Sequence, residues 1–152
     1  MALVGVVIGS KTDTDLIQPA LDMLKQLGID YELSVISAHR NPEKVREYGL
    51  GAEKRGLKVI IAAAGKAAHL PGVIASWTTL PVIGVPLPSG ELEGVDALLS
   101  ISQMPGGVPV ACMGIGKSGA KNAALFAAQI LGTDSKETRE AYRKYKQELT
   151  RD

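Results

Sequence analysis

Residues 3–9 read LVGVVIG, an unbroken apolar run that is rich in β-branched side chains. Such a run, with no polar residue at alternate positions, is typical of a parallel strand buried on both faces of a sheet. The next stretch, TDLIQPALDMLKQLG at residues 14–28, places its apolar side chains at helical spacing instead. A strand followed by a helix is the repeating unit of α/β proteins, so this first segment already indicates the fold class.

The same alternation continues along the chain. Further strands are expected at residues 31–37, 57–64, 81–87 and 109–115, and helices within residues 41–56, 68–80, 95–104 and 120–132. Strands and helices that alternate in this way predict a three-layer, doubly wound parallel sheet with helices on both faces. We expect one α/β domain over residues 1–132.

The tail, residues 133–152, has a different pattern. It begins with a candidate capping box, Asp134 with Glu137, and its apolar stripe is thin. A helix of this kind buries little by itself. We therefore expect a C-terminal helical extension that packs on the domain or on a neighbouring subunit.

Local signals refine the helix positions. Asn41 and Pro42 form a strong helix start, with Asn41 as the cap and Pro42 at the first helical position. Pro19 fits best in the first turn of its helix, so that helix is expected to begin late or to bend. Gly49 and Gly51 each cost a helix up to ~1 kcal/mol, which predicts that something packs closely against them.

Composition excludes several classes of function. The 152 residues carry 17 basic and 16 acidic side chains, a net charge of +1, so there is no electrostatic footprint for nucleic acid or for an anionic membrane. No apolar run approaches the ~20 residues needed to cross a bilayer, and the first residues have no leader pattern. We expect a cytoplasmic protein that binds neither nucleic acid nor membrane.

Cysteine and histidine are scarce. Cys112 is the single cysteine, which excludes an internal disulfide and a cysteine-based metal cluster. It lies in an apolar run, so we expect a small buried hydrophobe rather than a nucleophile. The two histidines have no accompanying carboxylate cluster, and we expect no metal site.

Ligands of parallel sheets bind beyond the carboxyl ends of the strands. Three segments of this chain fall there: GSKTD (9–13), SAHRNP (37–42) and AAGKAAHLPG (63–72). They contain most of the scarce polar groups, namely Ser10, Asp13, Ser37, His39, Arg40, Lys66 and His69. We expect these side chains to form one binding site.

Each group has a chemical use and a simpler alternative. Ser10 can face an anion or hydroxyl groups at a helix start. Asp13 can accept hydrogen bonds from sugar hydroxyls, although Thr12 or Asp13 could equally be only a helix cap. Arg40 offers a planar fork suited to phosphate, or it is a solvated surface arginine. His39 can exchange protons near neutral pH.

The two histidines and the glycine-rich segment at residues 114–119 each have alternative interpretations. A loop histidine such as His39 is more often structural than catalytic, and His69 could be a hydrogen-bonded core histidine. GIGKSG, residues 114–119, satisfies G-x-G-x-x-G, but it follows the last strand rather than the first. A nicotinamide site is therefore not expected, which leaves a phosphate or close-packing role for these glycines.

Six motifs occur in order over about residues 4–132: GSKTD, VISAHRNPEK, AAHLPG, LPVIGVP, GVDALLSISQMPGGVPV and GKSGAKNAALFAAQIL. In this combination the chain closely resembles the N5-carboxyaminoimidazole ribonucleotide mutase family of purine biosynthesis, often labelled the catalytic subunit of phosphoribosylaminoimidazole carboxylase. The resemblance implies a flavodoxin-like catalytic domain and a homo-octamer with sites at subunit junctions. It also implies transfer of a carboxylate from the exocyclic nitrogen of a ribonucleotide to ring carbon C4, without metal or organic cofactor.

The resemblance also assigns roles. His39 matches the catalytic histidine that carries a proton between the leaving nitrogen and the ring carbon. The positions matching substrate-binding residues are Ser10, Asp13, Ser37 and Arg40 on the ribose and phosphate side, and Gly65, Lys66, Ala67, His69 and Leu70 in the loop that closes over the heterocycle and shelters carbon dioxide.

One stretch departs from the family pattern. The family typically has GAGGAAHLPG where this chain has AAGKAAHLPG, so Ala63 and Lys66 replace glycines. Lys66 could reach a substrate carboxylate or phosphate, point to solvent, or hinder closure of the loop. Two other functions remain open: direct carboxylation with free carbon dioxide, in a related branch that lacks the histidine of AAHLP, and a flavodoxin-type module for flavin or nucleotide.

Overall fold

The structure is a computed structural model that describes residues 1–151. Its centre is one sheet of parallel strands: β1 (Val4–Ile8), β2 (Tyr31–Val35), β3 (Val59–Gly65), β4 (Val82–Leu87) and β5 (Ala111–Cys112). The strand order β2-β1-β3-β4-β5 is that of flavodoxin-like proteins. The predicted doubly wound sheet is confirmed, although β5 is shorter than predicted and starts only after Pro109, which has no N–H to donate to a ladder.

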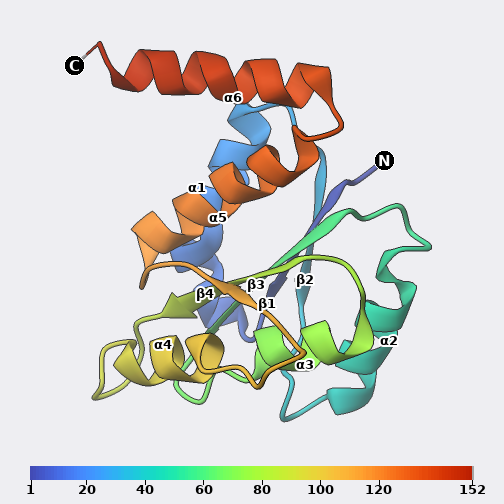
Figure 1. Cartoon of the computed structure of the whole chain (residues 1–152). Coiled ribbons are helices and arrows are strands. Elements are labelled where there is room, and N and C mark those ends of the chain that lie inside the picture. The colour runs from blue at the N-terminus through green and yellow to red at the C-terminus, as the bar shows by residue number, and fades with distance from the viewer. Residues whose placement is uncertain (152) are drawn as a thin grey trace.

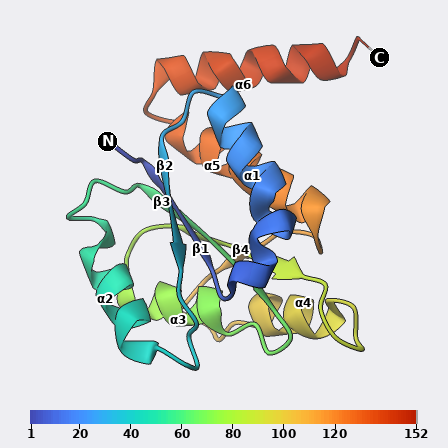
Figure 2. The ribbon, with the colours of Figure 1, turned by 180° about the vertical axis from the view of Figure 1, so that it is seen from behind.

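Helices cover both faces of the sheet (Figures 1 and 2). One face carries α1 (Thr14–Gln26), entered through a short 3₁₀ turn, η1 (Lys11–Asp13), and α5 (Lys117–Leu131). The other face carries α2 (Pro42–Ala52), α3 (Leu70–Trp77) and α4 (Val95–Ser102), and α6 (Lys136–Leu149) crosses the ends of α1 and α5. Among residues 1–151, none of the helices is both long and apolar enough to cross a bilayer.

The core explains the unbroken apolar strands. Along β3, Ile61 and Ala63 pack toward α1 and α5, whereas Ile60 and Ala62 pack toward α2, α3 and α4. All four side chains are fully buried. Because both faces of each central strand are covered, no position of the strand favours a polar residue.

Three local predictions have mixed outcomes. Pro42 is the first residue of α2, as expected, but Asn41 before it makes no capping bond with its side chain. Pro19 lies at the sixth position of α1 rather than in its first turn. A Cβ on Gly49 would come within 2.7 Å of the Trp77 Cβ, so close packing there is confirmed, whereas a Cβ on Gly51 would meet only the flexible end of Arg55.

The predicted capping box of the tail is wrong by one residue. Ser135, not Asp134, is the cap of α6, because its side chain accepts a hydrogen bond from the backbone N–H of Thr138 at 3.2 Å. Glu137 therefore does not serve as the partner of a cap at Asp134.

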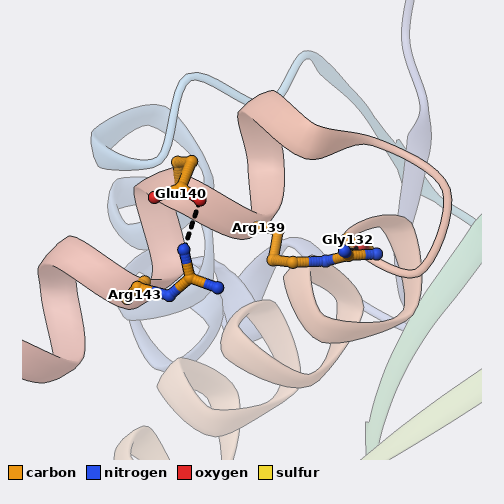
Figure 3. A network of polar contacts seen from close by, with 4 residues as sticks. All are labelled: Gly132, Arg139, Glu140 and Arg143. Carbon is orange, nitrogen blue, oxygen red and sulfur yellow. Dashed lines mark hydrogen bonds and ion pairs between the residues drawn. The ribbon is translucent and has the colours of Figure 1, made fainter.

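A polar network fixes the start of α6 to the end of α5 (Figure 3). The Arg139 guanidinium donates to the carbonyl oxygens of Gly132 at 2.7 Å and Thr133 at 2.9 Å. One turn further on, Arg143 pairs with Glu140. The helix thus satisfies carbonyl groups that the end of α5 leaves unpaired.

Candidate active site

The loops after β1, β2, β3 and β4 line an open cavity of about 600 Å³. Strand register brings them together, because Ile8 at the end of β1 pairs with Val35 at the end of β2 and with Ala63, two residues before the end of β3. All ten residues predicted from the sequence line this cavity: Ser10, Asp13, Ser37, His39, Arg40, Gly65, Lys66, Ala67, His69 and Leu70.

The two histidines bond directly to each other. His39 Nε2 lies 2.7 Å from His69 Nδ1, and the rings are nearly perpendicular, at 88° with their centroids 4.8 Å apart. Such a bond requires one nitrogen to carry a proton and the other to accept it. His69 is exposed at the N-cap of α3, so the alternative of a core histidine is wrong. The pair can hold and pass a proton at the cavity.

The loop after β1 presents two hydroxyls and a carboxylate. Ser10 Oγ lies 2.9 Å from Thr12 Oγ1 and accepts from the Thr12 backbone N–H, so Ser10 caps η1. Asp13 occupies the N-cap position of α1 but makes no capping bond with its side chain. The reading of Asp13 as a helix cap is therefore not supported, and its carboxylate is available to a ligand.

Burial raises the pKa of the Asp13 carboxyl, and a hydrogen bond to the backbone of Ser10 partly offsets the shift. A raised pKa means that the folded protein binds this proton more tightly than the unfolded chain. The stability linked to protonated Asp13 is therefore present below the ordinary carboxyl pKa and is lost as the pH rises through the raised pKa.

Asp13→Asn should therefore unfold at a higher temperature than the parent at pH 7, because the amide carries no charge to desolvate. The difference should narrow as the pH is lowered to about 3, where the parent carboxyl is protonated in both states. Thermal melts from pH 3 to 8 measure it. Asp15→Asn, an exposed charge one turn or less away on α1, is the matched control. The same pH-dependent gain in both variants would contradict this assignment.

Arg40 has an unpaired guanidinium. Its backbone N–H donates to Ser37 Oγ at 3.3 Å, which shapes the turn after β2. Within the part of the chain that the structure describes, the guanidinium makes no hydrogen bond or ion pair with protein atoms. Its planar fork is thus free to take an anion from the cavity.

The loop after β3 is tightly built. A Cβ on Gly65 would lie 2.6 Å from Ser89 Oγ and 3.3 Å from the Leu87 carbonyl oxygen, so only glycine fits there. Lys66 has a left-handed backbone, with φ at 55°. The next turns close through bonds of 2.8 Å from Ala68 N–H to the Lys66 carbonyl and from His69 N–H to the Ala67 carbonyl. Together these turns direct the chain toward the start of α3.

The two departures from the family glycines differ in consequence. Ala63 is fully buried and packs toward α1 and α5, and its methyl group does not line the cavity. Lys66 does line the cavity. Only the lysine therefore bears on the chemistry of the site.

Six residues of the cavity were not among the predicted ones: Gly9, Thr12, Ala38, Ala64, Ser89 and Gly90. The first four belong to the predicted loops or lie beside them in the sequence. Ser89 and Gly90 follow β4, so the rule that ligands bind beyond the carboxyl ends of parallel strands points to them as well.

The remaining candidates lie outside the cavity. In GIGKSG, a Cβ on Gly119 would overlap the carbonyl oxygen of Gly114, which favours the close-packing role. Cys112 is only partly buried, rather than fully as expected, and burial raises the pKa of its thiol, which disfavours the nucleophilic thiolate. Among residues 1–151, no three His, Cys, Asp or Glu side chains gather as a metal site.

Comparison with known proteins agrees with this geometry. A family model described as AIR carboxylase matches residues 3–152. The N5-carboxyaminoimidazole ribonucleotide mutase of Saccharolobus solfataricus is 56% identical over 152 residues, which cover 100% of this chain and 95% of that protein. The protein of the same name from Pseudomonas aeruginosa is 55% identical over 149 residues, covering 98% and 91%.

A solved structure shows the same fold. The crystal structure of Treponema denticola PurE has a TM-score of 0.87 to this chain at 29% sequence identity, and the match covers 99% of this chain and 92% of that one. The resemblance inferred from the motifs is thereby confirmed along the whole chain. This chain belongs to the AIR carboxylase family.

Proposed function

We propose that this protein converts N5-carboxyaminoimidazole ribonucleotide to 4-carboxy-5-aminoimidazole ribonucleotide in purine biosynthesis. The main support for this proposal is the hydrogen-bonded pair of His39 and His69, which shares one cavity with Asp13 and with the Arg40 guanidinium. The names and high identity of the relatives support it. They also make a flavin-binding module a poorer account of the chain.

The cavity offers a binding surface for each part of such a ribonucleotide. Arg40 would bind the phosphate through its fork, and Ser10 with Asp13 would hold the ribose hydroxyls. The heterocycle would then lie under the loop of His69, next to His39. This arrangement puts the proton-carrying imidazole beside the reacting atoms.

His39 serves both halves of the reaction in turn. As the bond between the exocyclic nitrogen and the carboxyl carbon breaks, its electron pair stays on nitrogen, which takes a proton from protonated His39. Carbon C4 then attacks the released carbon dioxide, and neutral His39 removes the C4 proton to restore the aromatic ring. The histidine begins and ends protonated, so atoms and charge balance without an external acid or base.

His69 would fix the orientation of His39 during these steps. If His69 Nδ1 accepts from His39 Nε2–H, the other nitrogen of His39 is left to exchange the proton with the substrate. In this arrangement His39 Nε2 makes the orienting hydrogen bond, and His39 Nδ1 exchanges the proton.

The wall next to the heterocycle suits carbon dioxide. Ala64, Gly65 and Ala67 line the cavity with the smallest side chains, and Ala62 and Ala63 are buried behind them. Carbon dioxide has no charge that a side chain can grip, so shape and exclusion of water must retain it. Excluding water also protects the reactive intermediate.

A direct assay tests the proposal. The purified protein should convert N5-carboxyaminoimidazole ribonucleotide rapidly, and it should form no rapid product from aminoimidazole ribonucleotide with bicarbonate. The opposite pattern would indicate a direct carboxylase. No conversion of either substrate would reject both functions.

We also propose a homo-octamer in the cytoplasm, as the family resemblance implies. Leu92, Val95 and Leu99 leave an apolar stripe exposed at the start of α4 and along it, at 61%, 51% and 55%. Three large apolar side chains exposed on one segment favour its burial against another subunit. Light scattering should give a mass about eight times 16.0 kDa. A monomeric mass would reject the assembly and leave the site to be completed within one chain.

A further inference from the structure

Lys66 carries a charge at a position of unusual backbone geometry. Its φ of 55° lies in the left-handed region, which side chains with a Cβ rarely adopt. Glycine would adopt this conformation more easily, and the family pattern has glycine here. In this chain a long cation occupies the position and lines the cavity, where it can contact a bound ligand.

The stem of Lys66 lies along the wall of the cavity. Its Cε is 3.3 Å, and its Cγ 3.9 Å, from the point that a Cβ would occupy on Gly90. A side chain at residue 90 would therefore crowd the lysine. The glycine thus leaves room for the lysine stem beside the cavity, between the loops after β3 and β4.

Lys66 has no acidic partner among the residues that the structure describes. Among the described residues that line the cavity, Asp13 is the only carboxylate, whereas Arg40 and Lys66 are both cationic. The site therefore carries a net positive charge even with both histidines neutral. It favours a ligand with more than one anionic group.

The two cations come from loops after different strands. Arg40 lies in the loop after β2, Lys66 directly follows β3, and these two strands flank β1. A ribonucleotide with a phosphate and a carboxylated base offers one anionic group to each of these cations.

We infer that Lys66 is a specificity-determining residue that binds the carboxylate of the nucleotide, while Arg40 binds its phosphate. Lys66 adjoins Gly65 and Ala67 and lies three residues before His69, on the side assigned to the heterocycle. The inference rests on the proposed function. It makes the site discriminate carboxylated nucleotides from aminoimidazole ribonucleotide, which has the same phosphate and ribose but no carboxylate.

Binding measurements on both nucleotides test this role. Lys66→Asn keeps a residue that tolerates the left-handed conformation but removes the charge, whereas Lys66→Arg keeps the charge. Measured by calorimetry, the affinity for 4-carboxy-5-aminoimidazole ribonucleotide should fall about three- to tenfold in Lys66→Asn, the range for a charge contact at a solvent-accessible site. Its affinity for aminoimidazole ribonucleotide should stay unchanged, and Lys66→Arg should retain most of the affinity for both.

Kinetics give a second readout. Substrate and product both carry the carboxylate, whereas the carbon dioxide between them is neutral, so this contact stabilises the bound nucleotides rather than the step between them. Lys66→Asn should therefore raise KM more than it lowers kcat. A merely structural role would instead lower the affinity for both nucleotides and reduce kcat as well.

Arg40→Ala provides the contrast, because it should lower the affinity for both nucleotides by the same factor. Equal weakening of both nucleotides by Lys66→Asn, or no weakening of either, would overturn the role of Lys66 while leaving the proposed function intact. If the parent protein binds neither nucleotide, the proposed function itself fails.

Discussion

His39→Asn is expected to lower turnover of N5-carboxyaminoimidazole ribonucleotide by about 10²–10⁴-fold and to leave nucleotide affinity nearly unchanged. The Asn side chain is shorter than the imidazole and gives up the 2.7 Å bond that His39 Nε2 makes with His69 Nδ1. It cannot take up and return a proton near neutral pH. The loss should therefore fall on kcat, since the phosphate and ribose contacts remain.

Steady-state kinetics and calorimetry on the same preparation separate the two effects. His69→Asn is the matched comparison, because it removes the partner imidazole but leaves the proton carrier. We expect its kcat to fall less than that of His39→Asn. Near-normal turnover in His39→Asn would contradict the role of His39, and a large loss of affinity would show that the residue acts chiefly in binding.

Gly119→Ala is expected to be the most damaging small substitution in the fold, lowering the free energy of unfolding by about 3 kcal/mol. Alanine is normally about 1 kcal/mol better than glycine inside a helix. Here a Cβ would overlap the backbone carbonyl of Gly114, and a backbone group has little freedom to move aside. The overlap should outweigh the gain in helix propensity.

At this chain length, 3 kcal/mol corresponds to a fall in melting temperature of roughly 6–12 °C. Gly106→Ala is the matched control, because a Cβ at that glycine would meet nothing within 4 Å. Calorimetric melts of the two variants measure the difference. Equal melting temperatures would show that the start of α5 adjusts at little cost, which would remove the packing role from the glycines of residues 114–119.

The sequence specified the sheet well because burial on both faces leaves a clear pattern. The runs that became β1 and β3 have no polar alternation, and both strands are buried in the centre of the sheet. The site could be located for the same reason: loops after parallel strands must meet at one edge. The sequence therefore predicts that Ser10, Asp13, His39 and His69 lie in one place, and all four line the cavity.

Contacts between loops cannot be predicted from the pattern of apolar and polar residues. The bond from His39 to His69 joins residues 30 positions apart, and its length depends on how the turn at residues 65–69 closes. The left-handed backbone of Lys66 and the position of its stem beside Gly90 likewise have no sequence pattern of their own. At the tail, Ser135 and Asp134 are both good caps, and the dihedral angles of the turn decide between them.

In the proposed reaction, carbon dioxide leaves one atom of the nucleotide and rejoins another without escaping from the cavity. This confinement can be tested with N5-carboxyaminoimidazole ribonucleotide that carries ¹³C in its carboxyl group, converted in a buffer rich in unlabelled bicarbonate. Mass spectrometry of the product should find the label retained at C4. A product whose carboxyl group has taken its carbon from the buffer would show that the cavity does not confine the gas, and would contradict this account of the site.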